Sequence, residues 1–335
     1  MARDVLRCER PPGRPVGYVA IMKVLVTGGA GFIGSHIVDR LQAEGHDVSI
    51  VDSLVGGKRA NLASALERGA RLHVLDIRDQ ELRSVLTAER PEVILHLAAQ
   101  IDVRVSVADP VLDADVNIAG SLNLLEGARA AGSRKVIVTS SGGCIYGEPS
   151  SLPVKETYRG TPDSPYGISK KVLHDYLAFY ATAHGLDYTV LALANVYGPR
   201  QDPTGEAGVV AIFLGAMLAG RQPVIYGDGK QTRDFIHVSD VVDAFARAIT
   251  RGSRTVFNIG TGVETNVLEL WDACARAAGY GGEVAFAPPR LGELERIALD
   301  ATRAKRKLGW SPRVTLAEGI ADTAAWVGAS AERTG

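Results

Sequence analysis

The chain has 335 residues, of which 46% are hydrophobic and 22% are charged, and its formal net charge is −1. This composition is typical of a folded protein with a sizeable core and excludes a largely disordered chain. The nearly neutral charge gives no general attraction to nucleic acid or to an anionic membrane. We therefore expect a small-molecule partner that is held by a local site.

The start of the chain differs from the rest. Residues 1–21 carry several arginines and a Pro11-Pro12 pair, and they lack the apolar core of a signal peptide. We expect a flexible N-terminal extension, with the compact domain beginning at Met22. The apolar residues 209–220 are too few to span a bilayer, so no membrane association is expected.

Cysteine usage bears on the compartment. Cys8, Cys144 and Cys274 form neither a CxxC metal-binding pair nor an even set of disulfides. Free thiols fit a reducing compartment, which predicts a cytoplasmic protein with no metal site.

The first predicted element is an apolar strand, residues 23–27, that runs into a glycine-rich turn and a helical pattern over residues 33–44. The first glycine permits the tight turn, the second lets a pyrophosphate approach the backbone, and Gly34 lets the helix pack closely on the strand. The helix N-terminus then faces the phosphates of a dinucleotide. The residues expected at this pyrophosphate are Gly28, Gly31, Phe32 and Ile33.

Asp52 closes the second predicted strand, residues 46–51. It lies at about the 20-residue spacing at which the fold places an acid on the adenosine ribose, where its charge would repel a 2′-phosphate. This favours NAD over NADP. The alternative is that Asp52 only caps the turn that follows.

Strands and helices continue to alternate through residues 71–139, which predicts a doubly wound parallel α/β sheet with both faces covered. Asp76 and Ile77 follow the third strand and are expected near the adenine. Leu97, Ala98, Ala99 and Gln100 follow the fourth strand, where small residues let the cofactor approach. Asn117 lies among apolar neighbours in a helical stretch that Pro110 interrupts, as a satisfied polar core residue would.

From residue 196 on, long loops with glycine and proline separate shorter elements. Loops of this length are more often functional than structural. We therefore divide the chain into an NAD-binding Rossmann domain, residues 22–195, and a region over residues 196–330 that is mainly a smaller α/β substrate lobe. A strand at residues 255–259 is expected to return to the sheet.

Tyr166 and Lys170 lie four residues apart in a predicted helix, and therefore on one helical face. A tyrosine is a poor base at neutral pH unless a nearby cation stabilises its phenolate. Lys170 fits that role, and it can also hold the nicotinamide ribose. Such a pair is common by chance, so further support is needed.

Ser140 and Ser141 supply that support, because hydroxyls at the carboxyl end of a strand lie in the crevice where open α/β sheets bind ligands. A nucleophilic serine is the competing interpretation. The sequence has no Gly-x-Ser-x-Gly elbow, which disfavours a hydrolase.

Taken together, these motifs resemble the extended short-chain dehydrogenase/reductase superfamily and, within it, the UDP-sugar 4-epimerases. The resemblance runs from Met22 to about Trp326. Its specific parts are the segment 27–34, Asp52-Ser53-Leu54 with Gly57-Lys58-Arg59, Asp76-Ile77, Tyr146-Gly147, Tyr166-x-x-x-Lys170 and the segment 195–200.

The resemblance implies an isomerase that interconverts UDP-glucose and UDP-galactose through a transient 4-keto intermediate and bound NAD. It implies Ser141 and Tyr166 at the sugar hydroxyl, Lys170 on the cofactor ribose, and Asn117 as a support through a helix bend. It also implies a homodimer formed by the helices near residues 106–132 and 165–184. Contacts to the uridine diphosphate are implied for Asn195, Tyr226, Arg233, Arg290 and Glu293.

Two positions depart from the family pattern. Many members have the catalytic hydroxyl at the position of Gly142, so Ser141 must reach the substrate by a one-residue shift, with Ser140 as the alternative. Ala192 stands where the family often has arginine, which removes one polar contact near the substrate lobe.

Other activities remain open at this point. Dehydratases of the superfamily carry an Asp-Glu pair where Gly142 and Gly143 stand here, which disfavours elimination. A UDP-glucuronate 4-epimerase and an inactive NAD-binding regulator are further candidates, and the intact Ser141, Tyr166 and Lys170 set disfavours the regulator.

Overall fold

The computed structural model describes residues 21–203, 208–289 and 294–332. Its centre is a sheet of seven parallel strands in the order β3-β2-β1-β4-β5-β6-β11. This order confirms the predicted doubly wound Rossmann fold, whose ligand crevice opens where β1 and β4 diverge. The strands are β1 (Lys23–Thr27), β2 (Asp47–Asp52), β3 (Arg71–Val74), β4 (Val93–His96), β5 (Lys135–Ser141), β6 (Asp187–Leu193) and β11 (Thr255–Ile259).

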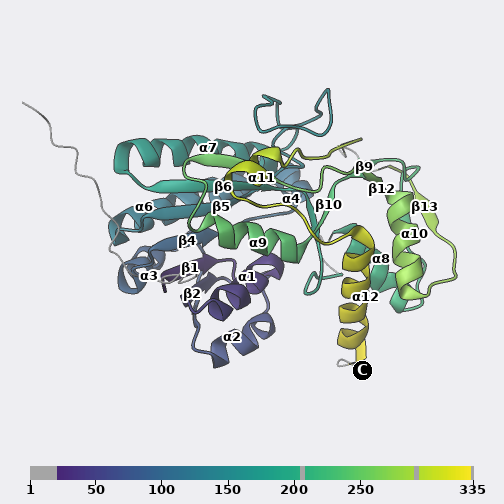
Figure 1. Ribbon diagram of the computed structural model, residues 1–335, viewed down its shortest axis with the longest axis horizontal. Coiled ribbons are helices and arrows are strands. Elements are labelled where there is room, and N and C mark those ends of the chain that lie inside the picture. Colours follow the sequence, from purple (N-terminus) through teal and green to yellow (C-terminus); the bar gives the residue numbers. More distant parts are fainter. Residues whose placement is uncertain (1–20, 204–207, 290–293, 333–335) are drawn as a thin grey trace, which may run out of the picture.

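Helices cover both faces of this sheet (Figure 1). Val24 and Val26 of β1 pack into one apolar cluster, and Leu25 between them packs into the other. Burial on both faces is the reason that the strands read as continuous apolar runs. One face carries α1 (Phe32–Ala43), η1 (Arg59–Leu62), α2 (Ala63–Glu67) and α9 (Val238–Ala248), and the other carries α3 (Glu81–Glu89), α6 (Ser121–Ala131) and α7 (Pro165–His184).

The helical stretch before α6 is broken, as the sequence predicts at Pro110. Asp102 caps α4 (Val103–Ala108), and Asp109 caps α5 (Pro110–Ala114). The chain then continues through a π-helical segment, η2 (Asp115–Gly120), directly into α6. A π-helical turn widens the helix and is frequent at functional sites.

A smaller lobe lies to the right of the sheet in Figure 1. Its own buried cluster includes Phe213, Leu214, Leu270 and Ile320. The lobe contains α8 (Val209–Leu218), α10 (Val267–Ala278) and α12 (Leu316–Glu332), with the strand pairs β7 (Asn195–Tyr197) with β10 (Phe235–His237), β8 (Val224–Tyr226) with β13 (Ala285–Ala287), and β9 (Thr232–Arg233) with β12 (Thr265–Asn266). The short helix α11 (Thr302–Lys307) instead contacts β11 of the large sheet.

The loop after β7 fastens this lobe to α1. Arg200 pairs with Asp39 at 2.7 Å, and the Pro199 carbonyl oxygen lies 2.8 Å from Nε2 of His36. Asp202 pairs with Lys58 at 2.7 Å. These contacts fix the loop beside the helix that follows the glycine turn.

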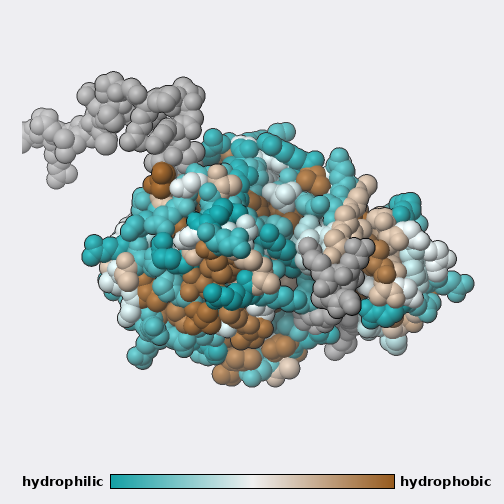
Figure 2. Space-filling model, turned by 90° about the horizontal axis from the view of Figure 1, so that it is seen from below, coloured by the Kyte–Doolittle hydropathy of each residue, from teal (hydrophilic) through white to brown (hydrophobic). Residues whose placement is uncertain are grey.

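The surface in Figure 2 is mixed, with hydrophobic residues gathering on the larger part of the molecule among hydrophilic ones. Within the described ranges, no helix is both long and apolar enough to cross a membrane.

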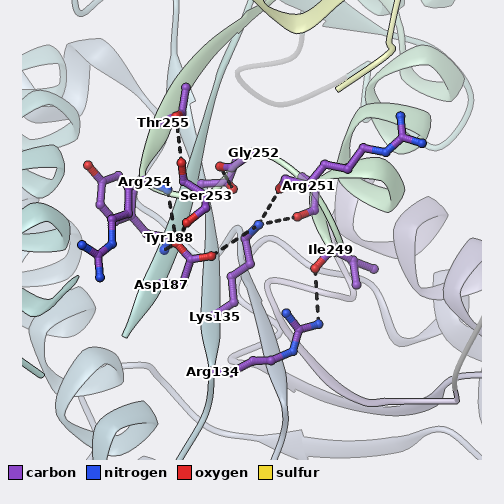
Figure 3. Close-up of polar contacts among 12 residues, drawn as sticks. Arg134, Lys135, Asp187, Tyr188, Ile249, Arg251, Gly252, Ser253, Arg254 and Thr255 are labelled. Carbon is purple, nitrogen blue, oxygen red and sulfur yellow. Dashed lines mark hydrogen bonds and ion pairs between the residues drawn. The ribbon is translucent and has the colours of Figure 1, made fainter. Parts of the chain in front are cut away.

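A buried lysine joins α9 to the sheet at the end remote from the crevice (Figure 3). The Lys135 ammonium, at the start of β5, donates to the carbonyl oxygens of Ala248 at 2.7 Å and Arg251 at 2.5 Å. Ala248 ends α9, where carbonyl groups lack helical partners and the helix dipole favours a cation. Burial lowers the pKa of Lys135 to about 8, against the opposing effect of Asp187.

Lys135→Met is expected to lower the free energy of unfolding by roughly 2–4 kcal/mol, because two buried carbonyl oxygens lose their donor. Lys23→Met is the matched control, because this lysine is exposed at the start of the neighbouring strand β1 and should change stability by about 0.5 kcal/mol or less. Urea denaturation measures both. Equal midpoints for the two variants would contradict a structural role of the buried ammonium.

Candidate active site

The glycine-rich turn between β1 and α1 has the geometry that a pyrophosphate site requires. Gly28 has φ +69°, and a Cβ there would lie 2.7 Å from the Ala98 nitrogen. A Cβ on Gly34 would collide with the Gly28 carbonyl oxygen, so the third glycine sets how closely α1 packs. Gly31 precedes Phe32 and Ile33 at the N-terminus of α1, which has no side-chain cap and no acidic residue in its first turn. Its amide groups are therefore suited to phosphate oxygens.

Asp52 lies at the end of β2 beside this turn. Its carboxylate accepts hydrogen bonds from the Ala30 and Leu54 backbone amides, both at 2.8 Å. It thus caps the following turn and also braces the glycine turn. Its position at the carboxyl end of β2 is compatible with the predicted contact to a ribose.

Asp76 and Ile77 behave differently from each other. The Asp76 carboxylate accepts hydrogen bonds from the Arg78 guanidinium at 2.9 Å, and these bonds hold its pKa below the ordinary value. Arg78 also pairs with Asp115 of η2 at 2.9 Å. Ile77 is buried against Gly120. Both residues therefore lie between the end of β3 and the π-helical turn.

Hydrogen bonds from the end of β1 anchor the stretch from Leu97 to Gln100. The backbone amides of Leu97 and Ala98 lie 3.2 Å from the Thr27 hydroxyl, which also contacts Nδ1 of His96 at 2.8 Å. Burial lowers the pKa of His96 to about 3, so the imidazole stays neutral. The backbone amide of Gln100 donates to Oδ1 of Asn117 at 3.0 Å, and the backbone carbonyl oxygen of Gln100 accepts from Nδ2 of Asn117 at 2.9 Å. Ala99 lies between these two anchored points.

Tyr166 and Lys170 occupy one face of α7, which begins after the cap Ser164. The Lys170 nitrogen lies 5.7 Å from the centre of the Tyr166 ring and 3.4 Å from the Thr139 carbonyl oxygen. Burial lowers the pKa of Lys170 to about 8. Burial also raises the pKa of Tyr166, and a hydrogen bond with Ser141 acts in the opposite direction.

The two candidate serines point to different partners. The buried Ser140 hydroxyl contacts Nε2 of His174 at 3.0 Å. The Ser141 hydroxyl instead acts on Tyr166 and on Cys144, and it lowers the pKa of both groups against the larger effect of burial. Ser140 and Ser141 are consecutive residues of strand β5, so their side chains point to opposite faces of the sheet. A Cβ on Gly142 would collide with the end of the buried Leu299 side chain, so a larger residue there requires Leu299 to shift.

Comparisons with known proteins agree with this geometry. Residues 24–260 match the family described as NAD dependent epimerase/dehydratase family. The chain belongs to this family. A UDP-glucose 4-epimerase of Mycolicibacterium smegmatis is 53% identical over 90% of this chain and 97% of that protein.

Two solved structures extend the likeness to the backbone. The UDP-glucose 4-epimerase of Thermotoga maritima with UDP-glucose has a TM-score of 0.90 and 48% identity, over 92% of this chain and all of that chain. The Thermus thermophilus UDP-glucose 4-epimerase complex with NAD has a TM-score of 0.87 and 44% identity, over 91% of this chain and 99% of that one.

The described residues that the sequence predicts at the uridine diphosphate lie on strands β7, β8 and β9 of the smaller lobe. Asn195 is exposed at the start of β7, and Tyr226 is exposed at the end of β8. Burial raises the pKa of Cys144, and the charge of Arg233 on β9 opposes that rise, so the Arg233 side chain lies on the same side of the molecule as the turn after β5. Arg290 and Glu293 lie outside the described residues.

Ala192 is fully buried in β6, directly beside Ser140 in the sheet. It packs in an apolar cluster with Tyr146, Ile297 and Leu299. A small side chain therefore serves packing at this position.

Three functional-site residues have no prediction from the sequence: Asp113, His96 and His174. Asp113 and His96 are each a polar residue in an otherwise apolar stretch, and that pattern is the signal that could have found them. His174 lies among charged residues of α7, so the sequence carries no comparable signal for it. His174 follows Lys170 by one helical turn, and burial lowers its pKa to about 4. Among the described residues, no group of three histidine, cysteine or acidic side chains could hold a metal ion.

Gly34→Ala is expected to weaken NAD binding at least roughly tenfold, because α1 must move away from the turn to admit the methyl group. Gly328→Ala in α12 is the control, since a Cβ there meets open space. Isothermal titration with NAD measures both affinities. Unchanged binding by the Gly34 variant would contradict the close helix–turn packing.

Proposed function

We propose that the chain is a UDP-glucose 4-epimerase that interconverts UDP-glucose and UDP-galactose with tightly held NAD. The observation that carries this proposal is the Ser141 hydroxyl close to the Tyr166 phenol, where it opposes the effect of burial on the phenol pKa, with the Lys170 ammonium beside the ring at the crevice edge of a dinucleotide-binding sheet. The named relatives support the same substrate class.

The chain offers a complete set of residues to hold NAD. The glycine turn and the N-terminus of α1 suit the pyrophosphate, Asp52 the adenosine ribose, and Lys170 the nicotinamide ribose. Asp76, Ile77 and the stretch from Leu97 to Gln100 line the same edge of the sheet, and Asn117 braces it. When bound, NAD accepts a hydride from the sugar and returns it.

Tyr166 performs the proton transfer. The phenolate accepts the proton of the sugar 4-hydroxyl as C4 is oxidised to the ketone, and Ser141 holds that oxygen through its hydroxyl. The Lys170 ammonium stabilises the phenolate. The ketose turns over about its linkage to the diphosphate, and Tyr166 returns the proton after hydride reaches the other face of C4.

The smaller lobe holds the nucleotide while the hexose turns. We assign Asn195 and Arg233 to the diphosphate side and Tyr226 to the uracil side, with Arg290 and Glu293 as further contacts predicted from the sequence. The positive charge of Arg233 close to the catalytic turn supports this placement.

Elimination of water from the sugar is disfavoured because Gly142 has no side chain that could serve as the general acid of a dehydratase. An acidic residue there would also displace the end of the buried Leu299 side chain. A uronate substrate is disfavoured because Ala192 and the two glycines supply no cation for a carboxylate.

We further propose a cytoplasmic homodimer. The free thiols of Cys144 and Cys274 support a reducing compartment. Packed side by side, α4, α5 and α7 leave an unusual number of apolar side chains exposed, which supports a partner on this face. These side chains are Val105, Val107, Val111, Leu112, Ile168, Tyr176 and Phe179.

Incubation of the purified chain with UDP-glucose should produce UDP-galactose, and proton NMR distinguishes the two sugars at the anomeric position. UDP-glucuronate should react at least roughly tenfold more slowly in kcat/KM. A reversed preference would identify a uronate epimerase. No turnover of any UDP-sugar would favour an NAD-binding regulator.

Tyr166→Phe should lower kcat by roughly 10²–10⁴-fold and leave UDP affinity nearly unchanged, because only the proton-transferring group is lost. Ser141→Ala should lower kcat more than Ser140→Ala, since Ser140 faces His174 and not Tyr166. Steady-state kinetics of the three variants measures both effects. A larger loss for the Ser140 variant would reverse the assignment of the two hydroxyls.

A further inference from the structure

A fully buried carboxylate lies behind the catalytic pair. Asp113, on α5, has no exposed surface. Its Oδ2 accepts a hydrogen bond from the Ser169 hydroxyl at 2.6 Å, and its Oδ1 accepts from the side-chain amides of Asn117 at 2.9 Å and Gln100 at 3.0 Å. Burying a carboxylate is costly unless a cation and hydrogen bonds offset the lost hydration.

The cation closest along the network is Lys170, which directly follows Ser169 on α7. Its ammonium is buried as well and has the Thr139 carbonyl oxygen at 3.4 Å as an acceptor. The Asp113 charge acts on both members of the catalytic pair. It raises the pKa of Lys170 against the larger effect of burial, and it adds to the raised pKa of Tyr166.

The other titratable groups around Lys170 are neutral. His96 faces it from β4 and His174 from the next turn of α7, and burial lowers their pKa values to about 3 and about 4. Cys144 lies near Tyr166, and burial raises the pKa of its thiol. None of these groups offers a charge at neutral pH.

The neighbouring acid on the α4 side is engaged elsewhere. Asp102 caps α4 by accepting hydrogen bonds from the Arg104 and Val105 amides, and it lies 3.6 Å from the Arg104 guanidinium. Gln100 joins the two acids, since its amide nitrogen also contacts the Asp102 carbonyl oxygen at 2.9 Å. Asp113 is therefore the buried charge that offsets the Lys170 ammonium.

We propose that Asp113 is a positioning residue for the epimerisation, which supplies the buried counter-charge of Lys170 and holds the Tyr166 face of α7 through Ser169. The catalytic consequence rests on the proposed function, whereas the charge pairing does not. An anion favours the protonated lysine, so Asp113 extends to higher pH the range in which Lys170 stabilises the tyrosinate.

A double-mutant cycle in stability tests the pairing without any assay of turnover. Lys170→Met leaves the Asp113 carboxylate buried without its cation, and Asp113→Asn leaves the ammonium without its anion. The double variant has lost both charges, so its urea midpoint should exceed the value that the two single shifts predict by addition. Additive midpoints would overturn the pairing.

The cycle stays informative if one variant folds poorly. Should Asp113→Asn fail to fold by itself, the double variant is expected to fold, because the remaining unpaired ammonium is gone. Failure of the double variant while Lys170→Met folds would also overturn the pairing.

The pH profile tests the catalytic consequence. In Asp113→Asn the alkaline limb of kcat should move to lower pH by about one unit, because Lys170 loses its proton more readily. Ser169→Ala keeps the charge and removes one hydrogen bond, so it should lower kcat without moving that limb. Asp115→Asn removes a half-exposed carboxylate two residues further along the chain, which pairs with Arg78, and should leave the profile unchanged.

The two proposals fail in different ways. Coupled midpoints in a protein that converts no UDP-sugar would support the pairing and overturn the proposed function. An active enzyme with additive midpoints and an unmoved alkaline limb would overturn the role of Asp113 alone.

Discussion

Burial of the Lys170 ammonium is the constraint on which the site depends. Packing α7 against the carboxyl end of β5 removes this group from water, and its pKa falls to about 8. The same low-dielectric surroundings strengthen its field at the Tyr166 ring, 5.7 Å from the ammonium nitrogen. A cation in such a place persists only if other groups offset the lost hydration, and the Thr139 carbonyl and Asp113 do so.

The two ends of strand β5 have different roles, one structural and one in the candidate site. Lys135 at the amino end of β5 fastens α9, and Ser141 at the carboxyl end acts on the pKa of Tyr166. At the same crevice edge, α1 presents uncapped amide groups at its N-terminus and anchors Arg200 through Asp39. The helix proposed to receive the pyrophosphate therefore also positions the loop after β7, which leads into the smaller lobe.

The parts of the site that the sequence predicts are those whose partners are close in the chain. The glycine turn, Asp52 and the Tyr166–Lys170 spacing follow from strand and helix periodicity. Period-two alternation predicts that Ser140 and Ser141 diverge, but it does not tell which one meets Tyr166. The Asp113–Ser169 bond joins residues 56 positions apart, so only the packing of α5 on α7 reveals it. Residues 187–193, which form β6, likewise have no assignment from the sequence.

The two glycines after Ser141 have different surroundings. A side chain at Gly142 would meet the end of the buried Leu299 side chain, so glycine at this position lets Leu299 pack against the turn. Around Gly143 the space is open, and the nearest neighbour of a Cβ at this position would be the Ser141 hydroxyl at 4.0 Å. An epimerase must leave room for the ketose to turn while its diphosphate is held. In the proposed reaction Ser141 contacts the reacting oxygen, and a glycine beside that hydroxyl adds no side chain that would restrict the turning sugar.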